Sequence, residues 1–166
     1  TALEGWGFNN VVVWSRGVDT DLFCPGERDR LDDSIPPRFV YIGRVAVEKN
    51  IEAFLQLDLP GSKWVVGDGP LMESLQRRYP NVWFAGAYPP AEPARFYRAA
   101  AVLVFPSLTD TFGLVLLEAM ACGTPVAVFP VAGPLDVVAS SGAGVLSQDL
   151  RQACLDAMAL DRQKVR

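Results

Sequence analysis

Residues 102–129 read VLVFPSLTDTFGLVLLEAMACGTPVAVF. The stretch begins and ends with a short run of β-branched and aromatic residues, and neither run alternates with polar residues. Such runs are typical of strands that are covered on both faces of a parallel sheet. Between them, a helix is predicted to begin near Gly113, and parallel neighbours need a crossover of this kind. The stretch therefore predicts one β-α-β unit.

The same alternation continues outward from this unit in both directions. Further strand-like runs occupy residues 11–14, 39–42 and 64–66, with another at 82–84. Segments with helical spacing lie between or after the runs, at residues 51–55, 71–79, 96–100 and 150–158. This order predicts an α/β fold, a doubly wound, Rossmann-like parallel sheet of about six strands with helices on both faces. A length of 166 residues suits a single domain over residues 1–166.

The composition excludes several classes of function. The net charge of −4, without a basic block, argues against a nucleic-acid partner. The chain contains no histidine, which excludes histidine-based acid–base chemistry and histidine-ligated zinc within it. The three cysteines are far apart in sequence, so we expect reduced thiols and a cytoplasmic protein. The longest uncharged stretch, residues 119–135, is interrupted by glycine and proline, so no membrane span is predicted.

Ligands of doubly wound sheets bind at the carboxyl ends of the strands, and two such ends carry suggestive residues. After the run at 39–42 come Gly43, Arg44 and Lys49, which would place two cations at the positive end of a helix and suit a diphosphate. The alternative is two surface cations near a helix start. After the run at 64–66 comes Gly67-Asp68-Gly69-Pro70, which is either half of a dinucleotide loop or a tight turn before a helix that starts at Pro70.

Residues 99–148 carry only three charges, Asp110, Glu118 and Asp136, and all are acidic. Carboxylates in so apolar a stretch need hydrogen bonds or a ligand. Asp110 and Glu118 would face one cleft across the helix start near Gly113, where free N–H groups suit phosphate and the carboxylates suit sugar hydroxyls. The alternatives are an N-cap for Asp110 and a capped or salt-bridged helix acid for Glu118.

Residues 105–126 resemble the acid–seven–acid signature of retaining glycosyltransferases of family 4, which have the two-domain B-type fold. Asp110 and Glu118 are the two acids. Four further pieces occur in the family's order: Gly17-Val18-Asp19 with Phe23 and Pro25, Gly43-Arg44 with Glu48-Lys49, Gly67-Asp68-Gly69-Pro70, and Phe84-x-Gly86. The match covers residues 10–140, and it implies the carboxy-terminal, nucleotide-sugar-binding half of such an enzyme.

The resemblance also implies site residues. Arg44 and Lys49 would hold the donor diphosphate, Glu118 would accept from the ribose hydroxyls, and residues 84–88 would flank the base. Asp110 would hold the donor sugar and phosphate, together with backbone N–H groups of residues 112–115. The usual first acid is Glu, so Asp110 is one methylene shorter than the family pattern. The implied catalytic residues are Arg44, Lys49 and Asp110, and the implied donor-binding residues are Gly43, Gly67, Gly86, Phe112, Gly113, Leu114, Val115 and Glu118.

The activity that the resemblance implies is transfer of a hexose, with retained anomeric configuration, from a UDP- or GDP-linked sugar to a lipid or glycan. It implies no metal and no cofactor beyond the nucleotide-sugar donor. It implies as partner an amino-terminal acceptor-binding domain of the same protein, through which a peripheral membrane contact is allowed. Without that domain the chain is expected to be inactive.

Two other classes of function remain open. One is a non-catalytic module that binds a nucleotide sugar or a partner protein, since a donor half would look the same. The other is a Rossmann oxidoreductase, which needs GxGxxG after its first strand. Trp14-Ser15-Arg16-Gly17 after the first predicted strand does not match that motif.

Overall fold

The computed structural model describes residues 2–12, 16–27, 31, 35–89 and 92–165. Its centre is one sheet of six strands in the order β3-β2-β1-β4-β5-β6, and every pair of neighbours is parallel. This confirms the predicted α/β class and Rossmann-like sheet. The strands are β1 (Arg38–Ile42), β2 (Ser62–Val66), β3 (Trp83–Gly86), β4 (Val102–Phe105), β5 (Val126–Val128) and β6 (Gly144–Leu146). The order reverses between β1 and β4, and doubly wound folds bind ligands at such a switch point.

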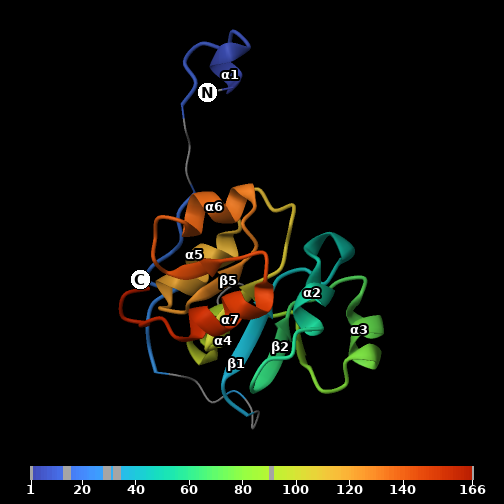
Figure 1. Cartoon of the computed structure of the whole chain (residues 1–166). Helices are drawn as coiled ribbons and strands as arrows, with labels where there is room; N and C mark the ends of the chain where they lie inside the picture. The colour runs from blue at the N-terminus through green and yellow to red at the C-terminus, as the bar shows by residue number, and fades with distance from the viewer. Residues whose placement is uncertain (1, 13–15, 28–30, 32–34, 90–91, 166) are drawn as a thin grey trace.

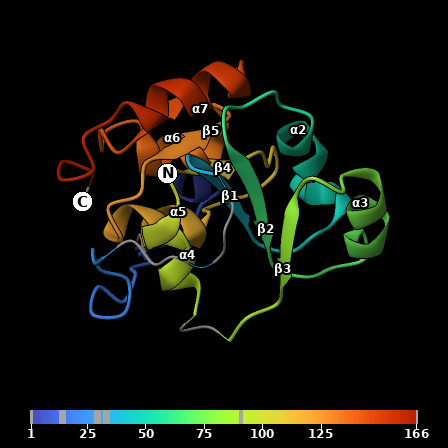
Figure 2. The same cartoon turned by 90° about the horizontal axis from the view of Figure 1, so that it is seen from below.

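Helices cover both faces of the sheet, as Figures 1 and 2 show. Alternate strand residues point to opposite faces, so Val40 packs in one core cluster while Phe39 and Tyr41 pack in the other. The first cluster is completed by α4 (Pro93–Ala99), α5 (Leu114–Ala121) and α6 (Ala132–Val138), and the second by α2 (Ile51–Leu55), α3 (Met72–Arg78) and α7 (Leu150–Met158). Among the described residues, the structure contains no helix with the length and apolar character needed to cross a bilayer.

The strand predicted at residues 11–14 is wrong where it can be checked. Val11 and Val12 lie outside any strand, and the Val12 side chain is 84% exposed; Val13 and Trp14 lie outside the described residues. A β-branched run becomes a strand only where a neighbour accepts its hydrogen bonds, and the described sheet offers none to Val11 and Val12. The sixth strand is instead β6, which the sequence prediction missed. It is only three residues long, begins with a glycine and is half-buried.

The amino-terminal residues carry one further helix, α1 (Ala2–Gly5). The large apolar side chains that follow it, Trp6 and Phe8, are exposed, as is Leu3 within it. None of these residues belongs to either core cluster. The described core is formed by the sheet, its six covering helices and a few loop residues such as Phe23 and Val165.

All three cysteines are free. Burial raises the pKa of the Cys122 thiol to about 11 and that of the Cys154 thiol to about 12. Both groups are therefore protonated at neutral pH, where they behave as small apolar side chains.

Candidate functional site

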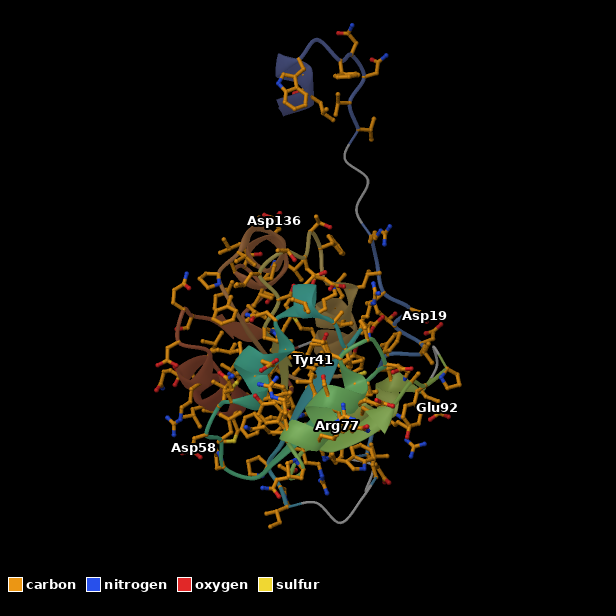
Figure 3. The ribbon with its side chains drawn as sticks, turned by 90° about the vertical axis from the view of Figure 1, so that its right-hand side faces the viewer. Asp19, Tyr41, Asp58, Arg77, Glu92 and Asp136 are labelled. Carbon is orange, nitrogen blue, oxygen red and sulfur yellow. The ribbon has the colours of Figure 1, made fainter. Side chains whose placement is uncertain are left out.

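A cavity of about 390 Å³ opens at the carboxyl ends of β1 and β4, on the switch point of the sheet. It lies between the loop that follows β1 and the loop that joins β4 to α5. In Figure 3, Tyr41 of β1 lies within the body of the molecule, whereas Asp19, Asp58 and Asp136 lie at the rim of the view. The residues that line the cavity are Arg16, Tyr41, Ile42, Gly43, Arg44, Lys49, Phe105, Ser107, Asp110, Thr111, Phe112, Gly113, Leu114 and Val115.

The start of α5 forms one wall of the cavity. Its N-cap is Gly113, which has a left-handed φ of 73°, and no described side chain caps the helix. The first four N–H groups of a helix have no acceptor within it, and the helix dipole makes this end positive. A Cβ at Gly113 would lie 3.1 Å from Leu116 and 3.3 Å from Phe105, so glycine suits both the backbone and the packing. The uncapped helix start is open to an anionic or hydroxyl-bearing ligand.

An ion pair joins the two loops inside the cavity. Lys49 Nζ donates to Asp110 Oδ1 at 2.6 Å, and the two side chains are only 28% and 21% exposed. Lys49 ends a short 3₁₀ turn, η1 (Val47–Lys49), which precedes α2. An ammonium has three donors, so the pair with Asp110 leaves Lys49 able to bind a further anion.

Two buried polar atoms of the cavity residues have no hydrogen-bond partner among the described residues. They are Asp110 Oδ2 and Ser107 Oγ. An unsatisfied buried polar atom costs about 1–3 kcal/mol, and more when it is charged. A carboxylate oxygen can only accept, whereas a serine hydroxyl can also donate. A ligand that carries hydroxyl groups would satisfy both atoms.

Arg44 lies at the mouth of the cavity. Its guanidinium is 3.5 Å from Glu48, and the two side chains are 66% and 53% exposed, so this pair is weak and screened by water. A hydrogen bond fixes the Arg44 backbone: the Tyr41 hydroxyl donates to the Arg44 carbonyl oxygen at 2.7 Å. Burial, and then the negative charges of Asp110 and Glu48, hold the pKa of the Tyr41 phenol well above its usual range. The phenol therefore stays protonated, and remains a hydrogen-bond donor, at neutral pH. Because its pair with Glu48 is weak, the Arg44 guanidinium is available to a ligand.

Two further hydrogen bonds hold the β1 loop against the β4 loop. Asn50 Nδ2 donates to the Pro106 carbonyl at 3.0 Å, and Thr109 Oγ1 donates to the Glu48 carbonyl at 3.3 Å. Together with the Lys49–Asp110 pair, they fix the positions of the cationic and acidic sides of the cavity relative to each other.

The structure brings most of the sequence-predicted site residues together at this cavity. Eight of them line it: Gly43, Arg44, Lys49, Asp110, Phe112, Gly113, Leu114 and Val115. The N-cap alternative for Asp110 is wrong, because α5 has Gly113 as its N-cap and Asp110 pairs with Lys49 instead. Six lining residues were not predicted as site residues: Arg16, Tyr41, Ile42, Phe105, Ser107 and Thr111. Ser107 could have been found, because it is a polar residue two positions beyond a buried strand.

Gly67 and Gly86 do not line the cavity, and they connect strand ends instead. The Gly67 N–H donates to the Gly86 carbonyl at 2.8 Å, and the Gly43 N–H donates to the Val66 carbonyl at 3.0 Å. The helix expected to start at Pro70 begins at Met72, and the N–H of its N-cap Leu71 donates to the Val45 carbonyl at 3.1 Å. These bonds hold the loop that contains Gly43 in place at the edge of the cavity.

Replacing Gly67 by alanine is expected to destabilise the fold by about 3 kcal/mol or more. A Cβ at Gly67 would overlap the Gly43 carbonyl oxygen, and the φ of +133° is one that side chains rarely adopt. Thermal and urea unfolding would measure the loss. The matched control is Gly5→Ala, since a Cβ at Gly5 meets nothing within 4 Å. Equal stability of the two variants would contradict the close approach of the loops.

Glu118, which was expected to face one cleft with Asp110, does not line this cavity and lies one helical turn beyond its wall. It follows Leu114 and Val115 by four and three positions on α5, so the three share one side of the helix. Its Oε2 accepts from the Tyr97 hydroxyl at 2.7 Å. The salt-bridged alternative for Glu118 finds no partner in the described part of the chain, where its contact is this neutral phenol.

Residues 36–160 match the family model described as "Glycosyl transferases group 1". Over 78% of its length the chain is 33% identical to sulfoquinovosyl transferase SQD2 of Arabidopsis thaliana, and over 87% it is 33% identical to a GDP-mannose-dependent alpha-mannosyltransferase of Corynebacterium glutamicum. The matches span 28% and 37% of those two proteins, so the chain covers about a third of their length.

A solved structure shows the same fold. The crystal structure of Anabaena Alr3699/HepE in complex with UDP and glucose superposes with a TM-score of 0.71 at 23% identity. The superposition covers 90% of this chain and 47% of that one.

Proposed function

Because the chain belongs to the glycosyl transferases group 1 family, we propose that it forms the donor-binding domain of a retaining glycosyltransferase. The proposed reaction moves a hexose from a UDP- or GDP-linked sugar to a lipid or glycan acceptor. The names of the similar proteins support a nucleotide-sugar donor, since one relative is GDP-mannose-dependent and one structural neighbour holds UDP and glucose.

The observation that carries the proposal is the composition of the cavity. Lys49 and the uncapped start of α5 favour an anion, while Asp110 Oδ2 and Ser107 Oγ are buried and lack partners. A nucleoside diphosphate sugar carries both kinds of group, anionic phosphates and sugar hydroxyls. It would satisfy these atoms at once, which neither a simple anion nor a neutral sugar would do.

The cations have a chemical role as well as a binding role. When the bond between the anomeric carbon and the diphosphate breaks, both electrons stay on the phosphate oxygen. The negative charge therefore develops beside Arg44 and Lys49, and stabilising it lowers the barrier. These side chains supply what a metal ion supplies in other phosphate chemistry, so the proposal needs neither a metal nor a further cofactor. Attack by the acceptor hydroxyl on the same face of the sugar, with its proton passing to the departing phosphate oxygen, would retain the configuration.

The acceptor would be held by a separate amino-terminal domain, which we propose as the partner of this one across a shared cleft. The chain spans only about a third of the two relatives reported above, which leaves room for such a domain in a protein of their kind. A cytoplasmic location, with a peripheral membrane contact through that second domain, completes the proposal.

Isothermal titration calorimetry with UDP, GDP and ADP tests the proposal. Binding of one nucleoside diphosphate, with competition from the matching nucleotide sugar, is the expected result. NAD serves as the control ligand. Binding of NAD alone would favour an oxidoreductase, and a chain that binds no nucleotide would favour an interaction module.

Replacing Glu118 by glutamine is expected to weaken binding of the preferred ribonucleotide about tenfold, because an amide accepts through only one oxygen. The matching 2′,3′-dideoxy nucleotide should bind the variant and the parent equally, since it lacks the hydroxyls. Glu73→Gln is the control, because the one partner of Glu73 among the described residues is Arg77, in an exposed pair. Equal losses for both ligands would make Glu118 a structural residue.

A further inference from the structure

Tyr97 places a phenol from α4 directly against the Glu118 carboxylate of α5. The tyrosine is fully buried, and its hydroxyl donates to Glu118 Oε2 at 2.7 Å. The two helices lie side by side on one face of the sheet (Figure 2). A buried phenol normally needs a hydrogen-bond partner, and here the partner is a residue that the sequence predicts for ligand binding.

The Tyr97 ring has little freedom to move. It packs in the core cluster with the helices on this face, and Phe23 contacts it edge-on with ring centroids 6.0 Å apart. The Tyr97 carbonyl also accepts from Thr124 Oγ1, which ties this turn of α4 to the residues before β5. Because close-packed interiors allow few alternative side-chain positions, the phenol oxygen is a fixed point for Glu118.

The Tyr97 phenol donates to Oε2 of Glu118 and makes no hydrogen bond to Oε1. Within the described part of the chain, Glu118 Oε1 has no hydrogen-bond partner. Burial, and then the nearby Glu118 charge, keep the pKa of the Tyr97 phenol well above its usual range, so the hydroxyl stays a donor at neutral pH. Glu118 is partly buried, and without this bond its carboxylate would sample several rotamers that a ligand would have to immobilise.

We propose that Tyr97 is a positioning residue for ribose recognition: by holding Glu118 Oε2, it presents Oε1 to the hydroxyls of a ribonucleotide. This inference rests on the proposed function, because it assumes that Glu118 accepts from the ribose. In this inference Tyr97 is buried and touches no ligand, and it sets the selectivity for ribose over deoxyribose by holding Glu118.

The test is Tyr97→Phe, which keeps the ring and removes only the hydroxyl. Calorimetry with the preferred nucleoside diphosphate should show affinity reduced by about five- to tenfold, while the affinity for its 2′,3′-dideoxy analogue stays unchanged. In a Glu118→Gln background, the same substitution should cause no further loss, because the two residues act as one unit. Tyr79→Phe is the matched control, since it removes another phenol–glutamate contact, to Glu52 at 3.4 Å, from the opposite face of the sheet.

The outcomes separate this inference from the function on which it rests. If the parent chain binds no nucleotide, the proposed function fails. If the parent prefers ribonucleotide and Tyr97→Phe keeps that preference, or loses both ligands equally, the positioning role fails. Should Tyr97→Phe not fold, a structure of the parent with nucleoside diphosphate decides. The inference then requires Tyr97 on Oε2 and a ribose oxygen on Oε1, and a ribose that displaces the phenol overturns it.

Discussion

Lys49→Ala is expected to weaken binding of the preferred nucleoside diphosphate by about ten- to a hundredfold, the equivalent of about 1.5–3 kcal/mol for a hydrogen bond to a charged group. The substitution removes the ammonium that lies inside the cavity, and it also leaves the Asp110 carboxylate without its described ion-pair partner next to an incoming phosphate. Titration calorimetry at fixed ionic strength measures the change. Arg44→Ala should lose less, because the Arg44 guanidinium is largely exposed.

A second variant separates phosphate binding from repulsion by Asp110. In Lys49→Ala/Asp110→Asn the negative charge is gone, so the part of the loss that persists in this double variant reports the missing contact between Lys49 and phosphate. Arg77→Ala removes an exposed cation that pairs with Glu73 away from the cavity, and it should bind as the parent does. If Lys49→Ala also binds like the parent, the assignment of the diphosphate to this side of the cavity is wrong.

The largest expected effect concerns transfer itself. The 166-residue chain should bind the nucleotide sugar yet transfer its hexose at least about 10⁵-fold more slowly than a protein that also contains the acceptor-binding domain. The cavity is proposed to bind only the donor, whereas holding the acceptor hydroxyl at reacting distance is worth about 7–11 kcal/mol in favourable cases. Transfer from a labelled nucleotide sugar, followed over time, measures the difference.

The stereochemistry of the product gives an independent check. A protein that also contains the acceptor-binding domain should yield a glycoside with the anomeric configuration of the donor, which the proton NMR spectrum of the product would show. A product of inverted configuration would contradict the retaining assignment. Rapid transfer by the 166-residue chain alone would contradict the division into donor and acceptor halves.

The fold could be predicted because each buried strand has a local signature. The uninterrupted runs ending at Ile42, Val66 and Phe105 become central strands, and such runs require cover on both faces. The two errors in the assignment of strands have one cause. Val11 and Val12 have a favourable composition and no partner among the described strands, whereas Gly144–Leu146 is short, begins with glycine and has a partner in β5. Pairing, which is a tertiary property, outweighs propensity in both places.

The candidate site was predictable to the extent that it follows strand ends. Gly43, Arg44 and Lys49 follow β1, and Asp110 follows β4, so adjacency of β1 and β4 in the sheet brings them together. The pairing of Lys49 with Asp110 across 61 residues could not be derived from spacing. The contact between Tyr97 and Glu118 could not be derived from spacing either. The packing of α4 and α5 over the sheet decides which faces of the two helices meet.

The links from Asn50 to Pro106 and from Thr109 to Glu48 join two loops that come from different strands. Loops that are already joined need not be ordered by an incoming ligand, so little conformational entropy is lost at that step. Binding should therefore involve small backbone movement on this side of the cleft. In the proposed two-domain enzyme, the motion that brings donor and acceptor together would then occur between the domains, and these two loops would move with the donor-binding domain.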